Sequence, residues 1–384
     1  MPHRPRFRSL LLTCLGILAA SGITHAANFS APRMELSTWG RMQDGDFGLF
    51  SRANVELLLE GGDKFRGRTE FTFQDNHLED SRPLPPAYDA DELQWTLQKN
   101  LRFKSISVEM KKLFGGPINL EYFTGATDIF ASGSDFLRSF DTDDFTSAVT
   151  GYEYFPQGVI YEGLHAVNGT GLKLRAPGLA GRFDLSLYTY QDAYFPKGRY
   201  SSDFRLLYNA ESLKIETFFG ATYPSPPYGL YRGGLMFFVS TGVGGEFFAQ
   251  IGIPRWDPDT DADFAAELFY LLFEPRVRVD RFSVILTFFW HPLYYRQAAT
   301  MEEGTLDFFV KFMYGDHRKK GIRGGLENKL GLQTRTRDEY HVQVSPFLSF
   351  LTSGVAWDLK LNIQLQPFAL DELIQTYIGI KTQL

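Results

Sequence analysis

Apolar and polar residues alternate along most of this chain. Between residues 357 and 366 the odd-numbered positions are apolar and the even-numbered positions are polar or charged. Successive side chains of a β-strand point to opposite sides, so this run predicts a strand with one apolar and one polar face. The same alternation recurs at 65–74 and, with Asn328 as its one exception, at 322–333. Further runs lie at 49–60, 172–176, 182–190, 213–222 and 373–384.

The segments between these runs alternate between short and long. Short connections lie at 61–63, 176–178, 209–211 and 352–354. Long connections, which are acidic or rich in proline, lie at 75–91, 191–199, 224–228, 257–263 and 296–304. Short turns on one side and long loops on the other are typical of an antiparallel up-and-down barrel.

Two all-β architectures produce such alternation, a soluble β-sandwich and a barrel that spans a membrane. Runs of about ten residues match strands that cross a bilayer at a tilt. The polar faces also carry unlike charges on adjacent strands, which a water-filled interior allows. A one-residue slip of 357–366 would place Asp358 and Lys360 in lipid, and a midplane Arg or Lys there costs about 2–4 kcal/mol. The pattern therefore favours the membrane barrel.

The last strand adds a more specific likeness. Its alternating positions are Ile374, Thr376, Ile378, Ile380, Thr382 and Leu384. In this feature, and in its alternation as a whole, the chain resembles the porin-type outer-membrane β-barrels of diderm bacteria. Members of that family usually end on an aromatic residue, whereas the last residue here is Leu384. The resemblance implies outer-membrane lipid and the barrel-assembly machinery as partners.

The expected fold is a closed antiparallel transmembrane β-barrel of about 18 strands. Five strands precede the long segment at 126–167, near 33–42, 48–60, 64–74, 102–112 and 117–125, and thirteen follow it. Chain ends on the same side of the membrane require an even number of strands. Residues 92–125 form either one long bulged strand or two strands with a turn, so 16 strands is the alternative.

Residues 1–26 are expected to be a cleaved signal peptide, and residues 27–384 the barrel. Arg4, Arg6 and Arg8 precede the apolar stretch Leu10–Ala20, and Thr24 and Ala26 supply the small residues of a cleavage site. The only cysteine, Cys14, lies in this segment. The barrel is therefore expected to contain no disulfide.

Composition excludes several classes of protein. The longest apolar run has eleven residues, whereas a membrane-spanning helix needs about 20. Aromatic residues make up 16% of the chain, which argues against disorder. The formal charge of −6 gives no reason to expect a nucleic-acid partner.

The polar faces supply the residues expected to line the pore. They are Arg52, Glu56, Arg66, Arg68, Glu70, Lys173, Arg175, Arg182, Lys214, Arg323, Glu327, Lys329, Asp358 and Lys360. Across the eight clearest strands bases outnumber acids on this face. Segment 126–167 is instead acidic and rich in aromatic residues, and loops of this kind are often functional. We expect it to be either a solvated surface loop or a constriction folded into the pore. Its charged residues include Asp128, Asp135, Arg138, Asp141, Asp143 and Asp144.

Signals for metal binding or catalysis are weak. Asp257, Asp259 and Asp261 resemble the start of a calcium loop, but Ala262 and Leu268 stand where such a loop needs Gly and Glu. No nucleophile elbow or phosphate-binding loop is present. We therefore expect no metal, no cofactor and no enzymatic activity.

The sequence thus predicts an outer-membrane channel through which small hydrophilic solutes or ions diffuse passively. Two other functions remain open: a plugged barrel that transports a specific or apolar ligand, and a surface adhesin or structural barrel. Selectivity in a channel would depend on pore radius and lining charge. Whether the barrel forms a homo-oligomer is also open.

Overall fold

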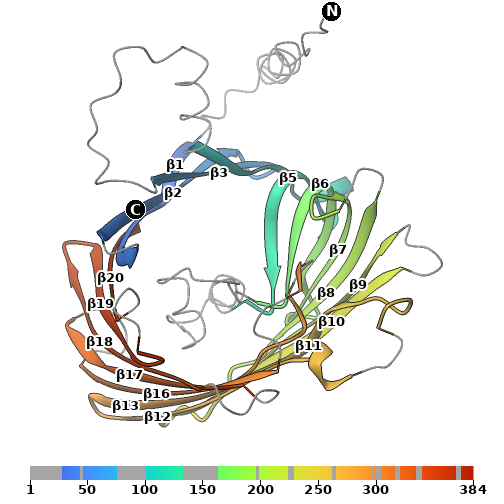
Figure 1. Ribbon diagram of the computed structural model, residues 1–384. Coiled ribbons are helices and arrows are strands. Elements are labelled where there is room, and N and C mark those ends of the chain that lie inside the picture. Colours follow the sequence, from blue (N-terminus) through green and yellow to red (C-terminus); the bar gives the residue numbers. More distant parts are fainter. Residues whose placement is uncertain are drawn as a thin grey trace, which may run out of the picture.

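The barrel is seen along its axis in the computed structural model (Figure 1). The structure describes residues 28–43, 46–75, 101–132, 163–195, 199–223, 229–261, 265–295, 298–299, 304–315, 321–333, 340–368 and 373–383. The first ten strands are β1 Asn28–Gln43, β2 Asp46–Gly61, β3 Phe65–Asp75, β4 Leu101–Met110, β5 Asn119–Phe130, β6 His165–Leu179, β7 Phe183–Asp192, β8 Tyr200–Asn209, β9 Leu213–Tyr223 and β10 Leu230–Ser240. The others are β11 Gly245–Trp256, β12 Tyr270–Val279, β13 Phe282–Trp290, β14 Tyr294–Tyr295, β15 Ala298–Ala299, β16 Thr305–Gly315, β17 Arg323–Gln333, β18 Tyr340–Thr352, β19 Val355–Gln366 and β20 Ile374–Gln383.

Eighteen of these strands form one closed antiparallel sheet. Each strand pairs with its neighbour in sequence, and β13 pairs directly with β16 because β14 and β15 form a separate small ribbon. The ring closes where β20 pairs with β1, from Arg33 opposite Gln383 to Arg41 opposite Gln375. The predicted count of 18 is confirmed, and the uncertain stretch before residue 125 contains two strands, β4 and β5, with a turn at 111–118.

Helical structure is minor in the part of the chain that the structure describes. It consists of two three-residue 3-10 turns, Leu113–Gly115 and Ala266–Leu268. No helix in that part is long and apolar enough to cross a membrane.

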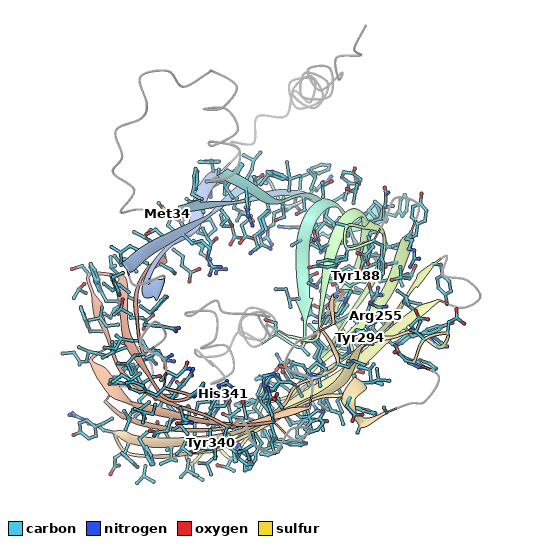
Figure 2. The ribbon with its side chains drawn as sticks, in the orientation of Figure 1. Met34, Tyr188, Arg255, Tyr294, Tyr340 and His341 are labelled. Atoms are coloured by element: carbon cyan, nitrogen blue, oxygen red, sulfur yellow. The ribbon has the colours of Figure 1, made fainter. Side chains whose placement is uncertain are left out.

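The strands keep the predicted alternation of faces. In β8, Ser201, Asp203 and Arg205 are buried, whereas Tyr200 and Ser202 are exposed. Figure 2 shows the consequence on β18, where Tyr340 lies on the outside of the ring and His341 on the inside. Residues directly opposite each other in adjacent strands share a face, so this orientation can be followed around the barrel through the register.

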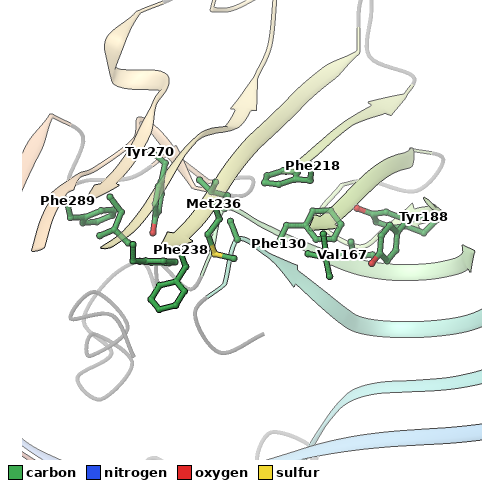
Figure 3. Packing of buried hydrophobic residues seen from close by; sticks show 14 of the residues in the cluster. Phe130, Val167, Tyr188, Phe218, Met236, Phe238, Tyr270 and Phe289 are labelled. Atoms are coloured by element: carbon green, nitrogen blue, oxygen red, sulfur yellow. The ribbon is translucent and has the colours of Figure 1, made fainter. Parts of the chain in front are cut away.

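A cluster of buried apolar side chains lies on the inner face of one half of the barrel (Figure 3). The cluster contains Phe123, Phe130, Val167, Tyr188, Tyr190, Leu207, Phe218, Met236, Phe238, Phe248, Tyr270, Leu272, Phe289 and Phe309 from β5–β13 and β16, together with Ala131 and Leu164. Alternation alone had predicted a polar inner face all round. Between β5 and β16 the inner face instead carries this apolar cluster among buried polar and charged side chains, and we call this part the clustered half. The other part, from β17 through β20 to β4, is mostly polar, and we call it the polar half.

Two predicted segments need comment. Residues 1–26, the expected signal peptide, lie outside the described residues. The expected loop at 126–167 is shorter than predicted, because 126–130 belong to β5 and 165–167 to β6.

Candidate functional site

The inner face of the barrel is the candidate site, and it contains almost all of the residues expected to line a pore. Thirteen of the fourteen lie on inward-facing positions of the strands. Arg182 is the exception, and its assignment is wrong: β7 begins at Phe183, so Arg182 lies exposed in the β6–β7 turn. The alternation continued by chance into the turn, which is why the sequence did not reveal this.

In the polar half, charges on β2–β4 form a chain of ion pairs. Arg68 Nε lies 2.7 Å from Glu56 Oε1, and Arg68 Nη2 lies 3.8 Å from Glu70 Oε2. Glu70 also accepts a hydrogen bond of 2.8 Å from Lys104 Nζ. Lys104 was not among the predicted lining residues, because a bulge between Glu70 and Phe71 shifts the register of β4.

A second polar stretch extends from β16 to β20. Lys360 Nζ and Lys311 Nζ lie 2.9 and 3.5 Å from the two carboxylate oxygens of Glu327. Neutral side chains follow: Ser345 Oγ donates to Asn362 Oδ1 at 2.7 Å, and Asn362 Nδ2 lies 3.4 Å from Gln375 Oε1. This part of the wall therefore offers both charged groups and neutral hydrogen-bonding groups.

Opposite the polar half, the tips of β5 and β6 leave the wall and turn inward. Phe130 at the end of β5 lies 5.0 Å from the ring of Phe218 in β9 and 5.3 Å from that of Tyr188. If β5 kept its place in the sheet, it would lie four strands, or about 19 Å, from β9. The tip must therefore cross over the inner face of the intervening strands.

The residues that follow β5 and precede β6 continue across the wall. Ala131 N donates to Glu216 Oε1 of β9 at 2.9 Å, and the Ala131 carbonyl accepts a hydrogen bond from Gln250 of β11. Leu164 is fully buried, and a methyl group added at Gly234 or Gly252 would lie 2.6 or 2.8 Å from its Cδ1. The described ends of the long connection are thus fixed to the inner face of β9–β11.

Asp128, expected in the loop, lies in β5 on the inward-turned tip. Its Oδ2 accepts hydrogen bonds from Lys173 Nζ at 2.5 Å and from Tyr188 OH at 2.7 Å. It looked like a loop residue because the β5–β6 register shifts between Ala126 and Asp128 and interrupts the alternation. The other charged residues of the predicted constriction, Asp135, Arg138, Asp141, Asp143 and Asp144, lie outside the described residues.

A buried polar cluster, formed by His165, Tyr190, Asp203 and Arg232, lies where β6 returns to the wall. Arg232 donates to both carboxylate oxygens of Asp203, at 2.7 and 2.8 Å. Tyr190 OH donates to Asp203 Oδ2 at 2.8 Å, and His165 Nε2 lies 3.1 Å from Tyr190 OH and 3.5 Å from Asp203 Oδ2. Nothing in the alternation indicated this cluster, because its members come from four different strands.

We expect Asp203→Ala to destabilise the barrel strongly. The substitution leaves the guanidinium of Arg232 buried without its carboxylate, which typically costs about 3–5 kcal/mol. The measurement is the urea midpoint of the refolded protein in detergent. Asp63→Ala is the control, because Asp63 and its partner Lys112 are mostly exposed, with 71% and 64% of their side chains accessible. If both variants unfold at the wild-type midpoint, the cluster does not stabilise the wall.

The aspartates that resemble a calcium loop form hydrogen bonds to backbone groups of their own loop. Asp257 Oδ1 accepts from the backbone N–H of Asp259 at 3.1 Å, and Asp261 Oδ2 accepts from that of Asp257 at 3.0 Å. Asp261 Oδ1 accepts from Tyr294 OH at 3.0 Å, and Arg255 stacks over the Tyr294 ring (Figure 2). Burial and the hydrogen bond to Asp261 raise the pKa of the Tyr294 phenol. No group of three or more His, Cys, Asp or Glu side chains placed to hold a metal occurs among the described residues.

Many charges on the inner face are paired. Asp128, Asp203, Glu274 and Asp307 each lie within 4 Å of a basic group. The strands beyond the eight clearest ones thus add bases, such as Arg232 and Arg276, as well as carboxylates.

Comparison with known proteins identifies the architecture. No family model and no curated protein matches the sequence. Among solved structures, Pseudomonas aeruginosa OccK10 (OpdN) superimposes with a TM-score of 0.55 at 10% identity over 93% of this chain and 99% of that one. Acinetobacter baumannii OccAB4 gives a TM-score of 0.50 at 10% identity over 92% of this chain and 96% of that one. Wzi, described as a carbohydrate-binding β-barrel involved in group 1 capsule assembly in Escherichia coli, gives 0.51 at 9% identity over 100% and 90%.

These likenesses concern the fold, because all three identities are low. They agree with the closed ring of antiparallel strands. The chain has the fold of the porin-type outer-membrane β-barrels that its sequence resembles.

Proposed function

We propose that this protein is an outer-membrane channel through which small hydrophilic solutes or ions diffuse. The observation that supports this most is the division of the inner face. The inward-turned tips of β5 and β6 cover the inner face in the clustered half. They leave the polar half, with its ion pairs and amide groups, as the surface along which a hydrated solute would pass. The selectivity of such a passage depends on its radius and the charges along it.

The proposal includes a constriction. The described ends of the β5–β6 connection, at Ala131 and Leu164, are bound to the inner face of β9–β11. The acidic residues at 135–144 would then face the bases of the polar half. No step of chemistry is involved, and the channel requires neither metal nor cofactor.

Apolar side chains such as Leu174, Leu187 and Ile251 are exposed on the outside of the strands, where they would contact lipid. We propose outer-membrane lipid as their partner and the barrel-assembly machinery as the route of insertion, after cleavage of a signal peptide. Oligomerisation is compatible with this arrangement, and chemical crosslinking in native membranes would detect it.

A second candidate function is binding of a saccharide on the inner face. The neutral hydrogen-bonding groups of Ser345, Asn362 and Gln375 favour this function. Wzi, which has a similar fold, is described as a carbohydrate-binding β-barrel. A bound sugar would block the ion current in a concentration-dependent way, whereas a freely diffusing sugar would not.

Liposome swelling tests the channel proposal. Proteoliposomes should swell in isotonic arabinose faster than in raffinose, because a narrowed passage favours the smaller solute. Empty liposomes provide the baseline. Swelling rates equal to that baseline for every sugar would refute passive diffusion.

A further inference from the structure

The barrel wall is incomplete between β4 and β5. These strands pair over only six residues, from Met110 opposite Leu120 to Ser105 opposite Gly125. Continuing the register would place Leu101–Lys104 opposite Ala126–Ile129, but these four residues of β4 pair with β3 alone or lie in its bulge. The facing residues of β5 pair only with β6 or lie in the bulge at Thr127.

The backbone at the point of separation explains why the strands part. Gly125 has a φ of +95°, which side-chain-bearing residues rarely adopt, and a Cβ atom there would collide with the carbonyl oxygen of Lys104. Just beyond the last pair, Ser105 opposite Gly125, β4 has a bulge at Lys104 and β5 has one at Thr127. These three irregularities at one place bend β5 inward, while Leu101–Phe103 of β4 stay in the wall, paired with β3.

The gap lies at membrane depth. Five residue steps of a tilted strand carry the pairing about 13 Å from the short-connection end, within an apolar band about 25 Å tall. Unpaired backbone groups are tolerated at such depth only if they are covered by protein or line a water-filled space. Arg102, Phe103 and Lys104 are all exposed, so none of the residues that the structure describes covers this edge of β4.

The rim of the gap is amphipathic across the wall. On the inner side, Arg102 lies opposite Thr72 and Lys104 is bound to Glu70, so both bases belong to the polar half of the lumen. On the outer side, Phe103 is 50% exposed and its ring lies 5.7 Å from that of Phe71, at an angle of 72°. A molecule in the gap would meet positive charge toward the lumen and aromatic rings toward lipid.

We propose that this gap is a lateral portal for an anionic amphiphile. The negatively charged headgroup enters between the strands toward Arg102 and Lys104, while the acyl chain stays outside against Phe103 and Phe71. Ionisable residues at membrane depth commonly mark such pathways. The inference goes beyond the diffusion channel and depends only on the barrel lying in a membrane.

Photo-crosslinking in nanodiscs tests the portal. The full barrel is incubated with lysophosphatidylglycerol that carries a diazirine on its acyl chain, and labelled peptides are mapped by mass spectrometry. We expect labelling to concentrate on peptides from β3 to β5. In the double variant Arg102→Ala/Lys104→Ala, labelling there should fall at least threefold, while the barrel keeps the heat-sensitive mobility of the folded protein.

Matched controls separate the portal from general lipid contact. Lys111→Ala/Lys112→Ala removes the same charge at the other end of the same hairpin and should leave labelling unchanged. Arg102→Lys/Lys104→Arg should retain it, which excludes misfolding as the cause of a loss. Zwitterionic lysophosphatidylcholine should label this region less than the anionic lipid.

Three results would overturn the proposal. They are uniform labelling around the barrel, labelling of β3–β5 that is unaffected by Arg102→Ala/Lys104→Ala, and equal competition by glycerol 3-phosphate, which would indicate a site for free anions. A barrel that fails these tests and still conducts would leave the diffusion function intact.

Discussion

Leu348→Arg is expected to prevent insertion of the barrel or to destabilise it by about 2 kcal/mol. Leu348 is 41% exposed on the outer face of β18, where its surroundings are hydrocarbon. An arginine there must either lose its hydration or distort the strand to reach the headgroups. The measurement is the fraction refolded into vesicles at increasing urea, read from the heat-sensitive mobility of the folded barrel.

The neighbouring residue provides the control for this prediction. Ser349 lies on the inner face, where its Oγ donates to Asp358 Oδ1 at 2.6 Å. Ser349→Arg places the same charge beside a carboxylate in the polar half, so folding should be close to wild type. Equal damage from both variants would mean that inner and outer faces have been assigned wrongly.

Deleting residues 134–150 is expected to raise the single-channel conductance several-fold. The segment begins two residues after Ser132, which is fully buried, and the contacts of Ala131 place this end of the connection on the inner wall. Removing these seventeen residues shortens the connection and should therefore widen the passage. The deletion also removes four aspartates and one arginine, so the cation preference should decrease.

The selectivity change should itself depend on salt. Exposed charges more than about 10 Å apart are largely screened at 0.1 M ionic strength, and the screening length is about 3 Å at 1 M. The difference in reversal potential between wild type and deletion should therefore shrink in concentrated salt, while the difference in conductance remains. An unchanged conductance would place the segment outside the passage.

Much of the fold could be predicted from the sequence because a membrane barrel imposes a strict rule on each strand. In β19 every second residue must be apolar toward lipid, so Trp357–Gln366 shows both the strand and its orientation. The strand number followed from counting such runs. The turn between β4 and β5 was harder to place, because the alternation changes phase at the bulge at Lys104, inside β4, and not at the turn.

The apolar cluster on the inner face could not be predicted from alternation, because the rule constrains only the side chains that face lipid. The sequence does contain a signal. Two adjacent phenylalanines occur at five places, one in each of β9, β10, β11, β13 and β16. In each pair one ring faces inward and the other faces outward. The inward members are Phe218, Phe238, Phe248, Phe289 and Phe309, which are at most 7% exposed. Two adjacent phenylalanines within an alternating strand therefore marked, in this chain, the strands whose inner side belongs to the apolar cluster.

The inward bend of β5 also escaped prediction, because it depends on backbone geometry. Gly125 and the bulge at Thr127 leave no trace in the hydrophobic pattern except a loss of phase, which looks the same as the start of a loop. The same loss of phase hid Asp128, whose contacts with Lys173 and Tyr188 come from strands that follow more than 35 residues later.

Single-channel recording of the refolded wild-type protein in a planar bilayer tests the central claim most directly. A water-filled passage along the polar half, narrowed by the β5–β6 connection, predicts discrete ohmic steps in potassium chloride and a conductance that rises in the 134–150 deletion. A correctly folded barrel that gives no steps in either form would contradict the account.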